Sequence, residues 1–139
     1  MGIETNFSRT IDLVHRALDA SALRREVIAD NISNAGTPNF KRSEVSFESQ
    51  LKRALDTEKQ RPPVELTRTD PRHIPNWQAQ DYRDIQPRRV LDYGSASQNN
   101  GNNVDADQEF MRALENQLMY RLLAQAETFE FSQINLVLR

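Results

Sequence analysis

A run of side-chain oxygens from Asn103 to Glu109 is the pattern in this chain that comes nearest to metal chemistry. The run reads Asn-Val-Asp-Ala-Asp-Gln-Glu, and a calcium loop also places oxygen ligands at alternate positions. That loop needs a glycine at its sixth position and a bidentate glutamate at its twelfth, where this chain has Gln108 and Leu114. Helix capping accounts for the run better, because Asp105 can accept a hydrogen bond from the N–H three residues on and Gln108 can reach back.

No residue that could act in catalysis has the partner residues that catalysis needs at a recognisable spacing. His73 could act as a general base, but neither a nucleophile nor an acid partner accompanies it. Residues 31–41 contain one glycine, which is too few to cradle a phosphate. The chain has no cysteine and two histidines, which excludes disulfides, cysteine nucleophiles and thiolate or histidine-rich metal sites. We therefore expect no enzyme, no cofactor and no small-molecule substrate.

The overall charge gives no general attraction to polyanions. Eighteen Lys and Arg stand against 20 Asp and Glu, for a net charge of −2, so we expect no nucleic-acid partner and no pull toward anionic membranes. No apolar run approaches the ~18 residues of a membrane-spanning helix. The N-terminus lacks the basic and apolar blocks of a cleaved secretory signal. We expect a protein that stays in the cytoplasm or leaves it by a route that needs no such signal.

Two long helices are the elements that this sequence predicts most strongly. Residues 7–34 and 105–138 contain no Gly or Pro, and their apolar residues recur at spacings of three and four. Each helix would be ~45–50 Å long, and patterns longer than ~25 residues are typical of coiled coils or assemblies. The residues predicted to pack are Ile11, Leu13, Val14, Leu18, Leu23, Val27 and Ile28 in the first helix and Met111, Leu114, Leu118, Leu122, Phe129 and Leu136 in the second.

The predicted fold is mostly α, with residues 1–35 and 104–139 paired as an elongated α-hairpin or coiled coil in one structural domain. Burial of the first set of apolar residues against the second should hold the hairpin. The apolar arc of the first helix exceeds half of the helical wheel, so we expect the remainder to meet neighbours. Periodicity alone leaves open whether the stripes are the core of a self-contained bundle or a surface for other chains.

The middle segment, residues 36–103, is predicted to be small and irregular. A short helix is expected over residues 43–56, with Phe47, Leu51, Ala54 and Leu55 on one face. Five of the six prolines follow within this segment, residues 64–67 alternate as a short strand does, and residues 95–103 are predicted to be a flexible joint.

A sharp turn is predicted where the first long helix ends. Asn34 and Gly36 can adopt the left-handed conformation that closes a helix. Thr37 precedes Pro38 and is therefore pushed toward an extended backbone. Phe40 can then fold back as a hydrophobic anchor.

The same residues resemble the N-terminal signature of the bacterial flagellar rod and hook proteins. That signature is roughly L-A-N-I-A-N-A, a small or polar residue, and T-P-G-Y-K; this chain has Ser33, Asn39 and Phe40 for the usual Ala, Gly and Tyr. Asn tolerates a positive φ better than most residues, so the turn can survive. The residues that match or lie in the turn are Asn31, Asn34, Ala35, Thr37, Pro38 and Phe40.

Two further motifs are similar to the branch of this family that builds the proximal rod. Residues 101–109 are similar to its G-N-x-V-D-L-D-x-E, and residues 115–121 to its E-N-Q-L-x-Y. The start of the C-terminal helix would be marked by Gly101, Asn102, Val104, Asp105 and Glu109. The resemblance extends over close to the whole chain.

The resemblance implies a structural subunit of the proximal rod of the flagellar basal body, a periplasmic axial assembly that transmits torque for motility. Such subunits are exported by the flagellar type III apparatus without a cleaved signal, and Phe7 and Ile11 are hypothesised to contribute to the export signal. The implied partners are further copies, other rod proteins, the adapter FliE, the MS-ring protein FliF and the export gate. The alternative is a soluble helical adapter or export chaperone that binds partners through the same stripes.

Overall fold

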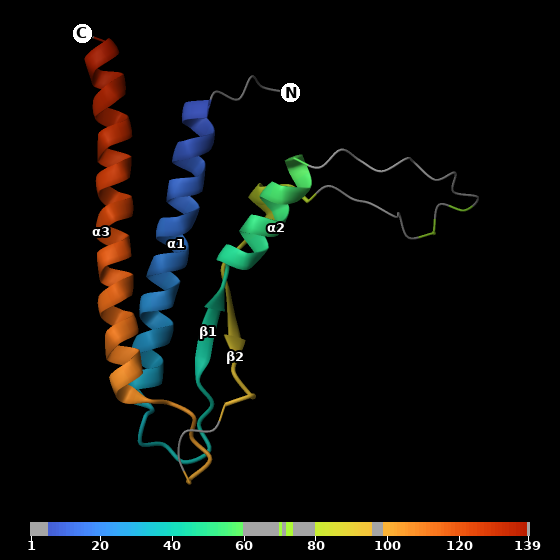
Figure 1. The fold of residues 1–139 in the computed structure, drawn as a ribbon, viewed down its shortest axis with the longest axis vertical. Coiled ribbons are helices and arrows are strands. Elements are labelled where there is room, and N and C mark those ends of the chain that lie inside the picture. Colours follow the sequence, from blue (N-terminus) through green and yellow to red (C-terminus); the bar gives the residue numbers. More distant parts are fainter. Residues whose placement is uncertain (1–5, 60–69, 71, 74–79, 96–98, 139) are drawn as a thin grey trace. The chain divides into compact units, whose positions relative to one another are not determined.

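The computed structural model describes residues 6–59, 70, 72–73, 80–95 and 99–138. The chain forms two compact units, one from Met1–Val45 with Pro87–Arg139 and the other from Ser46–Gln86. The prediction of a mostly α fold with long terminal helices is confirmed (Figure 1). In chain order the elements are α1 (Asn6–Ser33), β1 (Ser43–Ser46), α2 (Glu48–Lys59), η1 (Tyr82–Asp84), β2 (Arg88–Leu91) and α3 (Ala106–Val137).

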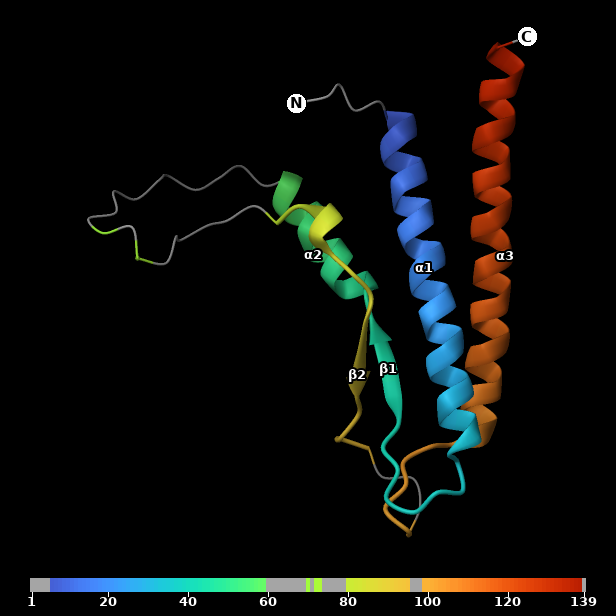
Figure 2. The same cartoon turned by 180° about the vertical axis from the view of Figure 1, so that it is seen from behind.

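The two long helices of the first unit run antiparallel, side by side, in both views (Figures 1 and 2). They contain 28 and 32 residues, and their ends lie within a residue of the predicted ones. The Asp105 half of the predicted capping box is present: the Asp105 side chain accepts hydrogen bonds from the N–H groups of Asp107 at 3.0 Å and Gln108 at 3.3 Å. Asp107 and Glu109 occupy the first turn, where the helix dipole favours negative charge.

The expected helix over residues 43–56 is wrong at its start. Residues 43–46 form β1, which pairs with β2 in a two-stranded antiparallel sheet (Figure 1). The physical reason is a side chain of α1: Asn31 binds both backbone polar groups of Ser43, at 2.8 and 3.0 Å, and holds the chain extended there. The short helix follows as α2. The possible strand over residues 64–67 lies outside the described residues, as does part of the predicted joint.

The second unit is small. Its helix α2 lies against η1, a single 3-10 turn that begins where the Asp81 side chain accepts from the N–H of Arg83 at 2.9 Å. Phe47 and Ala54, from the face predicted for the short helix, are buried. Tyr82 and Ile85 are buried too, so this unit carries a small apolar core of its own.

The face that α3 turns toward α1 differs from the prediction. We expected the C-terminal stripe to be buried against α1. Leu118 is 52% exposed and Phe129 is 60% exposed, and the other members of that stripe are exposed as well. The buried residues of α3 are instead Glu109 and Asn116. The side of α3 toward α1 is therefore mixed, with Glu109 and Asn116 buried and Leu123 and Ile134 half-buried, and the predicted stripe lies on the opposite side.

The chain turns in the left-handed conformation at two described residues. One is Asn39, where a positive φ was anticipated, and the other is Gly101, whereas the positions expected to close the helix do not adopt it. Asn39 has a φ of 60° and Gly101 a φ of 78°, whereas Asn34 and Gly36 do not adopt a positive φ. At Asn34 the backbone continues the helical pattern, since its N–H donates to the carbonyl of Asp30 at 3.1 Å. The reversal comes later, where the N–H of Asn39 donates to the carbonyl of Asn100 at 3.1 Å.

The structure predicts that Gly101→Ala destabilises the fold. A Cβ at residue 101 would lie 2.7 Å from Oδ1 of Asn39, at a φ that L-residues rarely adopt. We expect a loss of about 1–2 kcal/mol in the free energy of unfolding, measured by urea denaturation. Gly36→Ala is the matched control, because a Cβ at that residue would meet nothing within 4 Å; it should be neutral or slightly stabilising. Equal losses in the two variants would contradict the prediction.

Candidate functional site

A group of polar residues joins the end of α1 to the start of α3. Asn102 is fully buried, and its Nδ2 donates to the backbone carbonyls of Asn34 at 2.9 Å, Ala35 at 3.0 Å and Thr37 at 2.9 Å. Its Oδ1 accepts from the N–H of Val104 at 2.7 Å. One side chain from the second motif therefore closes the turn formed by the first. We call Asn31, Arg42, Asn102, Asn103 and Glu109 the helix-end cluster.

Asn31, at the end of α1, uses both ends of its side-chain amide. Its Nδ2 donates to the carbonyl of Ser43 at 2.8 Å and to Oε2 of Glu109 at 3.0 Å, and its Oδ1 accepts from the N–H of Ser43 at 3.0 Å. Asn31 is fully buried, where an unpaired amide would be costly. This residue therefore ties α1 to both β1 and α3.

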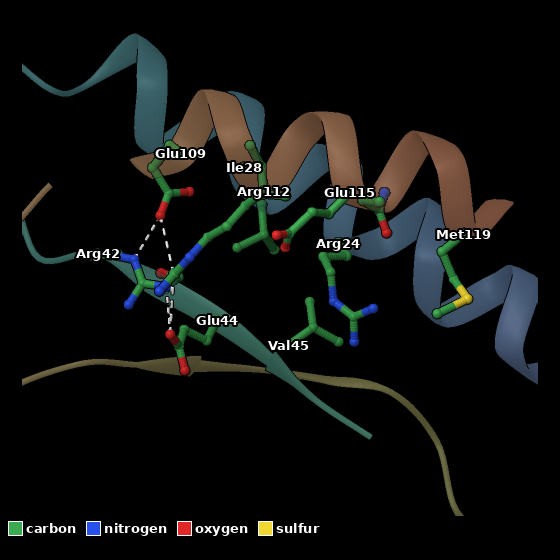
Figure 3. Close-up of a pocket in the computed structure, with 12 residues that line it drawn as sticks. Arg24, Ile28, Arg42, Glu44, Val45, Glu109, Arg112, Glu115 and Met119 are labelled. Carbon is green, nitrogen blue, oxygen red and sulfur yellow. Dashed lines mark hydrogen bonds and ion pairs between the residues drawn. The ribbon is translucent and has the colours of Figure 1, made fainter. Parts of the chain in front are cut away.

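The charged part of the cluster is centred on Arg42 (Figure 3). Its Nε donates to Oε1 of Glu109 at 2.6 Å, and a second nitrogen pairs with Glu44. Arg112 of α3 lies 3.2 Å from both of these carboxylates. Burial by itself would lower the pKa of Arg42, but the hydrogen bonds and charges of Glu109 and Glu44 outweigh it and the pKa is raised. The arginine stays charged at any ordinary pH.

Asn103 and Asp92 connect this cluster to the strand β2. Oδ1 of Asn103 accepts from the N–H of Arg42 at 2.6 Å, and its Nδ2 donates to the carbonyl of Asp92 at 2.7 Å. The Asp92 side chain accepts from the hydroxyl of Ser95 at 2.7 Å, which, with the N–H of Gly94 and the charge of Arg42, lowers the pKa of that carboxyl. The cluster therefore bonds to the turn after α1, to β1 and to the residue after β2, an arrangement that holds these segments together.

A cavity of about 370 Å³ lies beside the cluster, between α1, β1 and α3 (Figure 3). Val27, Ile28, Val45 and Met119 give it apolar walls, and charged side chains that include Arg24 and Glu115 line it as well. Within the described part of the chain, no group of acidic or histidine side chains could hold a metal ion. Over the same residues, no helix combines the length and the apolar character that crossing a membrane requires.

The uncovered face of α3 is the second feature of the site. Large apolar side chains are exposed along nearly the whole helix, and they are too numerous and contiguous for an ordinary monomer surface. A helix with apolar residues on most sides is normally buried. We call the exposed apolar stripe on the side of α3 opposite Glu109 and Asn116 the outer face: Met111, Leu114, Leu118, Leu122, Phe129 and Leu136.

The residues predicted from the sequence fall into two groups in the structure. The two family motifs meet in the helix-end cluster, through Asn31, Asn102 and Glu109 and the carbonyls of the turn. In the N-terminal stripe Val27 and Ile28 are buried, whereas Ile11, Leu13, Val14, Leu18 and Leu23 are half-buried. The residues of the C-terminal stripe are exposed and belong to the outer face. Phe7, with Ile11 the predicted export signal, lies half-buried in the first turn of α1.

Sequence reasoning gave no site role to four residues, Arg42, Asn103, Ser21 and Asn116, although Asn103 and Asn116 lie within the two motifs of the C-terminal helix. Ser21 and Asn116 bond to each other across α1 and α3. The spacing of seven residues between Glu109 and Asn116 could have identified Asn116, because residues seven apart lie on the same side of a long helix. No periodic signal marks Arg42 or Asn103, which lie outside the helices.

Asn102→Asp should strongly destabilise the subunit. The substitution keeps the oxygen that accepts from Val104 but places a second oxygen against three carbonyls. We expect a loss of about 3 kcal/mol or more in the free energy of unfolding, measured by urea denaturation at neutral pH. Asn99→Asp makes the same chemical change at an exposed turn residue and should lie within about 0.5 kcal/mol of the parent. A variant at 102 as stable as that control would show that the amide is not needed.

Comparisons with known proteins agree with this geometry. A family model described as "Flagella basal body rod protein" matches residues 14–41, which include the end of α1 and the turn of the helix-end cluster. The flagellar basal body rod protein FlgB of Borreliella burgdorferi is 43% identical over 134 residues, covering 96% of this chain and 98% of that protein. FlgB of Bacillus subtilis is 35% identical, with 95% of each chain covered, and FlgB of Escherichia coli is 36% identical, with 76% and 75% covered. The chain therefore belongs to the FlgB family of flagellar basal body rod proteins, which are structural proteins of the flagellum.

Proposed function

We propose that this rod subunit assembles by packing the outer face of α3, together with the half-buried stripe of α1, against neighbouring subunits. The observation that carries the proposal is the exposure of the apolar residues of α3 in a chain whose two long helices are already paired. The stripe residues of α1 and α3 named from the sequence are the contacts we propose. The two terminal helices then form the axial core of the assembly.

The hydrophobic effect supplies enough free energy for this assembly. Burial of apolar surface contributes about 25 cal/mol per Å², and a Leu or Phe side chain that becomes fully buried contributes roughly 1.5–3 kcal/mol. Several side chains of the outer face together would offset an association cost of about 4–15 kcal/mol. An axial rod needs head-to-tail contacts, because a closed two-fold dimer cannot propagate. One broad apolar surface along a long helix suits such contacts.

Family membership supports the proposed partners and location. These partners are further copies, other rod proteins, the adapter FliE and the MS-ring protein FliF, at the base of the periplasmic rod. We propose export through the gate of the flagellar type III apparatus and a purely structural role without catalysis. The soluble adapter or export chaperone is not favoured, because relatives that align with nearly the whole chain bear the name of a rod protein.

Leu118→Asp tests the assembly face. The side chain is 52% exposed in the subunit, so the change should leave the helix content of the purified chain intact. A carboxylate buried between subunits would cost several kcal/mol. Cells that carry this variant should be non-motile, with the protein still exported, as measured by swimming in soft agar and by immunoblots of exported protein.

Leu118→Met is the matched control, because it keeps the apolar volume and should preserve swimming. Motile cells with Leu118→Asp at a normal protein level would contradict the role of the outer face.

Phe7→Ala with Ile11→Ala tests the proposed export signal. Both residues are apolar and lie four positions apart at the start of α1. We expect secretion of the double variant to fall to background, measured as the fraction of protein outside the cytoplasm. Val14→Ala with Leu18→Ala removes a similarly spaced apolar pair from the same helix and should leave secretion unchanged. Normal secretion of the Phe7 and Ile11 double variant would end the hypothesis.

A further inference from the structure

The contact between α1 and α3 contains polar pairs along its length. Near the helix-end cluster, Asn31 donates to Glu109 at 3.0 Å. Farther along, the Ser21 hydroxyl donates to Oδ1 of Asn116, and Nδ2 of Asn116 donates to the carbonyl of Ser21, both at 2.9 Å. Near the far end, Nε2 of His15 lies 2.7 Å from Oε1 of Glu127.

The three polar residues of α3 in these pairs share one side of the helix. Asn116 follows Glu109 by seven residues, and Glu127 follows Asn116 by eleven. Both intervals return to nearly the same direction on an α-helix, because they are close to whole numbers of turns. The polar pairs therefore mark a continuous line on α3 that faces α1.

An alternative pairing is available to the same two helices. The stripe of Met111, Leu114, Leu118, Leu122 and Phe129 has the periodicity of a helix-packing surface. If α3 rotated about its axis, that stripe would lie on α1 and the polar residues would face water. Burial of the stripe would be favourable by the hydrophobic effect alone, so something specific must favour the observed arrangement.

We propose that Ser21 and Asn116 are positioning residues that set the rotation of α3 about its axis, so that its apolar stripe faces outward. Both residues are buried, with 1% and 7% of their surface exposed, and their two hydrogen bonds are reciprocal. In a coiled coil, a buried Asn at one core position selects a single register at some cost in stability. Here the pair selects a rotation, because a turned α3 would place leucine side chains against the Ser21 hydroxyl.

The other two pairs lie toward the ends of the contact. Glu109, bonded to Asn31 and Arg42 in the helix-end cluster, holds the rotation where α3 begins. His15 is about half exposed, so its contact with Glu127 is weakened by water and salt. Ser21 and Asn116 lie between these two and are shielded from solvent. The consequence for assembly rests on the proposed function, whereas the rotation itself is a property of the single subunit.

Disulfide trapping in the purified chain tests the rotation of α3. The chain has no cysteine of its own, so only the introduced cysteines can form a disulfide. His15→Cys with Glu127→Cys reports the observed arrangement. Leu18→Cys with Leu122→Cys reports the rotated one, since Leu122 is exposed in the structure. Under mild oxidation of the parent sequence, the 15–127 disulfide should dominate.

Asn116→Leu removes both hydrogen bonds. It should shift the ratio of the two disulfides by about tenfold toward 18–122, because the observed rotation loses both bonds and leaves the buried Ser21 hydroxyl without this partner. Ser21→Ala removes only the hydroxyl bond and should shift the ratio less, so it gives a second test should Asn116→Leu fail to fold. Gln117→Leu adds the same side chain at an exposed neighbour and should leave the ratio unchanged.

An unchanged ratio in Asn116→Leu and in Ser21→Ala would overturn the proposal, whether or not the melting temperature falls. A lower melting temperature with an unchanged ratio would assign the pair to stability only. Because trapping is done on the isolated subunit, its outcome is independent of the motility of Leu118→Asp cells. Failure of this inference and failure of the proposed assembly face can therefore be told apart.

Discussion

The buried carboxylate of Glu109 is the interaction on which the arrangement of the first unit depends. It is 1% exposed and receives hydrogen bonds from Asn31 of α1, from Arg42 before β1 and from Arg112 of its own helix. A charge removed from water costs several kcal/mol unless it is paired and hydrogen-bonded, and loss of one partner from such a group typically costs about 3–5 kcal/mol. The end of α1, the strand β1 and the start of α3 are therefore held together through one residue.

Beyond this cluster the helices extend as a pair whose contact is partly polar, so the subunit leaves much of its apolar surface uncovered. Hydrogen-bonded polar pairs contribute specificity more than net stability. In the proposed assembly, much of the hydrophobic free energy available to α3 would be gained only when neighbours cover the outer face. Binding that occurs only in the folded state stabilises that state by mass action, so we expect the subunit to be considerably more stable in the rod than alone.

The sequence predicted the two long helices well because their determinants are local. Absence of Gly and Pro, apolar spacing and the cap at Asp105 all act within a few residues of where they stand. It could not predict which side of α3 meets α1, because apolar periodicity is the same whether the stripe is covered by the same chain or by another. It also missed β1 and the role of Arg42, because both depend on side chains brought from distant positions: Asn31 holds Ser43 extended, and Glu109 neutralises the buried arginine.

The departures of this chain from the family signature fall where the structure can accept them. Ser33, in place of the usual Ala, is exposed, and its hydroxyl donates to the carbonyl of Ala29 at 2.8 Å. Asn39, in place of Gly, has a φ of 60°, a conformation that Asn adopts more readily than other residues with a side chain. The retained residues Asn31 and Asn102 are buried and bonded at both ends of their amides. A shorter or apolar side chain at either position would leave buried backbone groups without partners. An asparagine is therefore needed at both positions of the motif to bond the backbone where α1 ends and α3 begins.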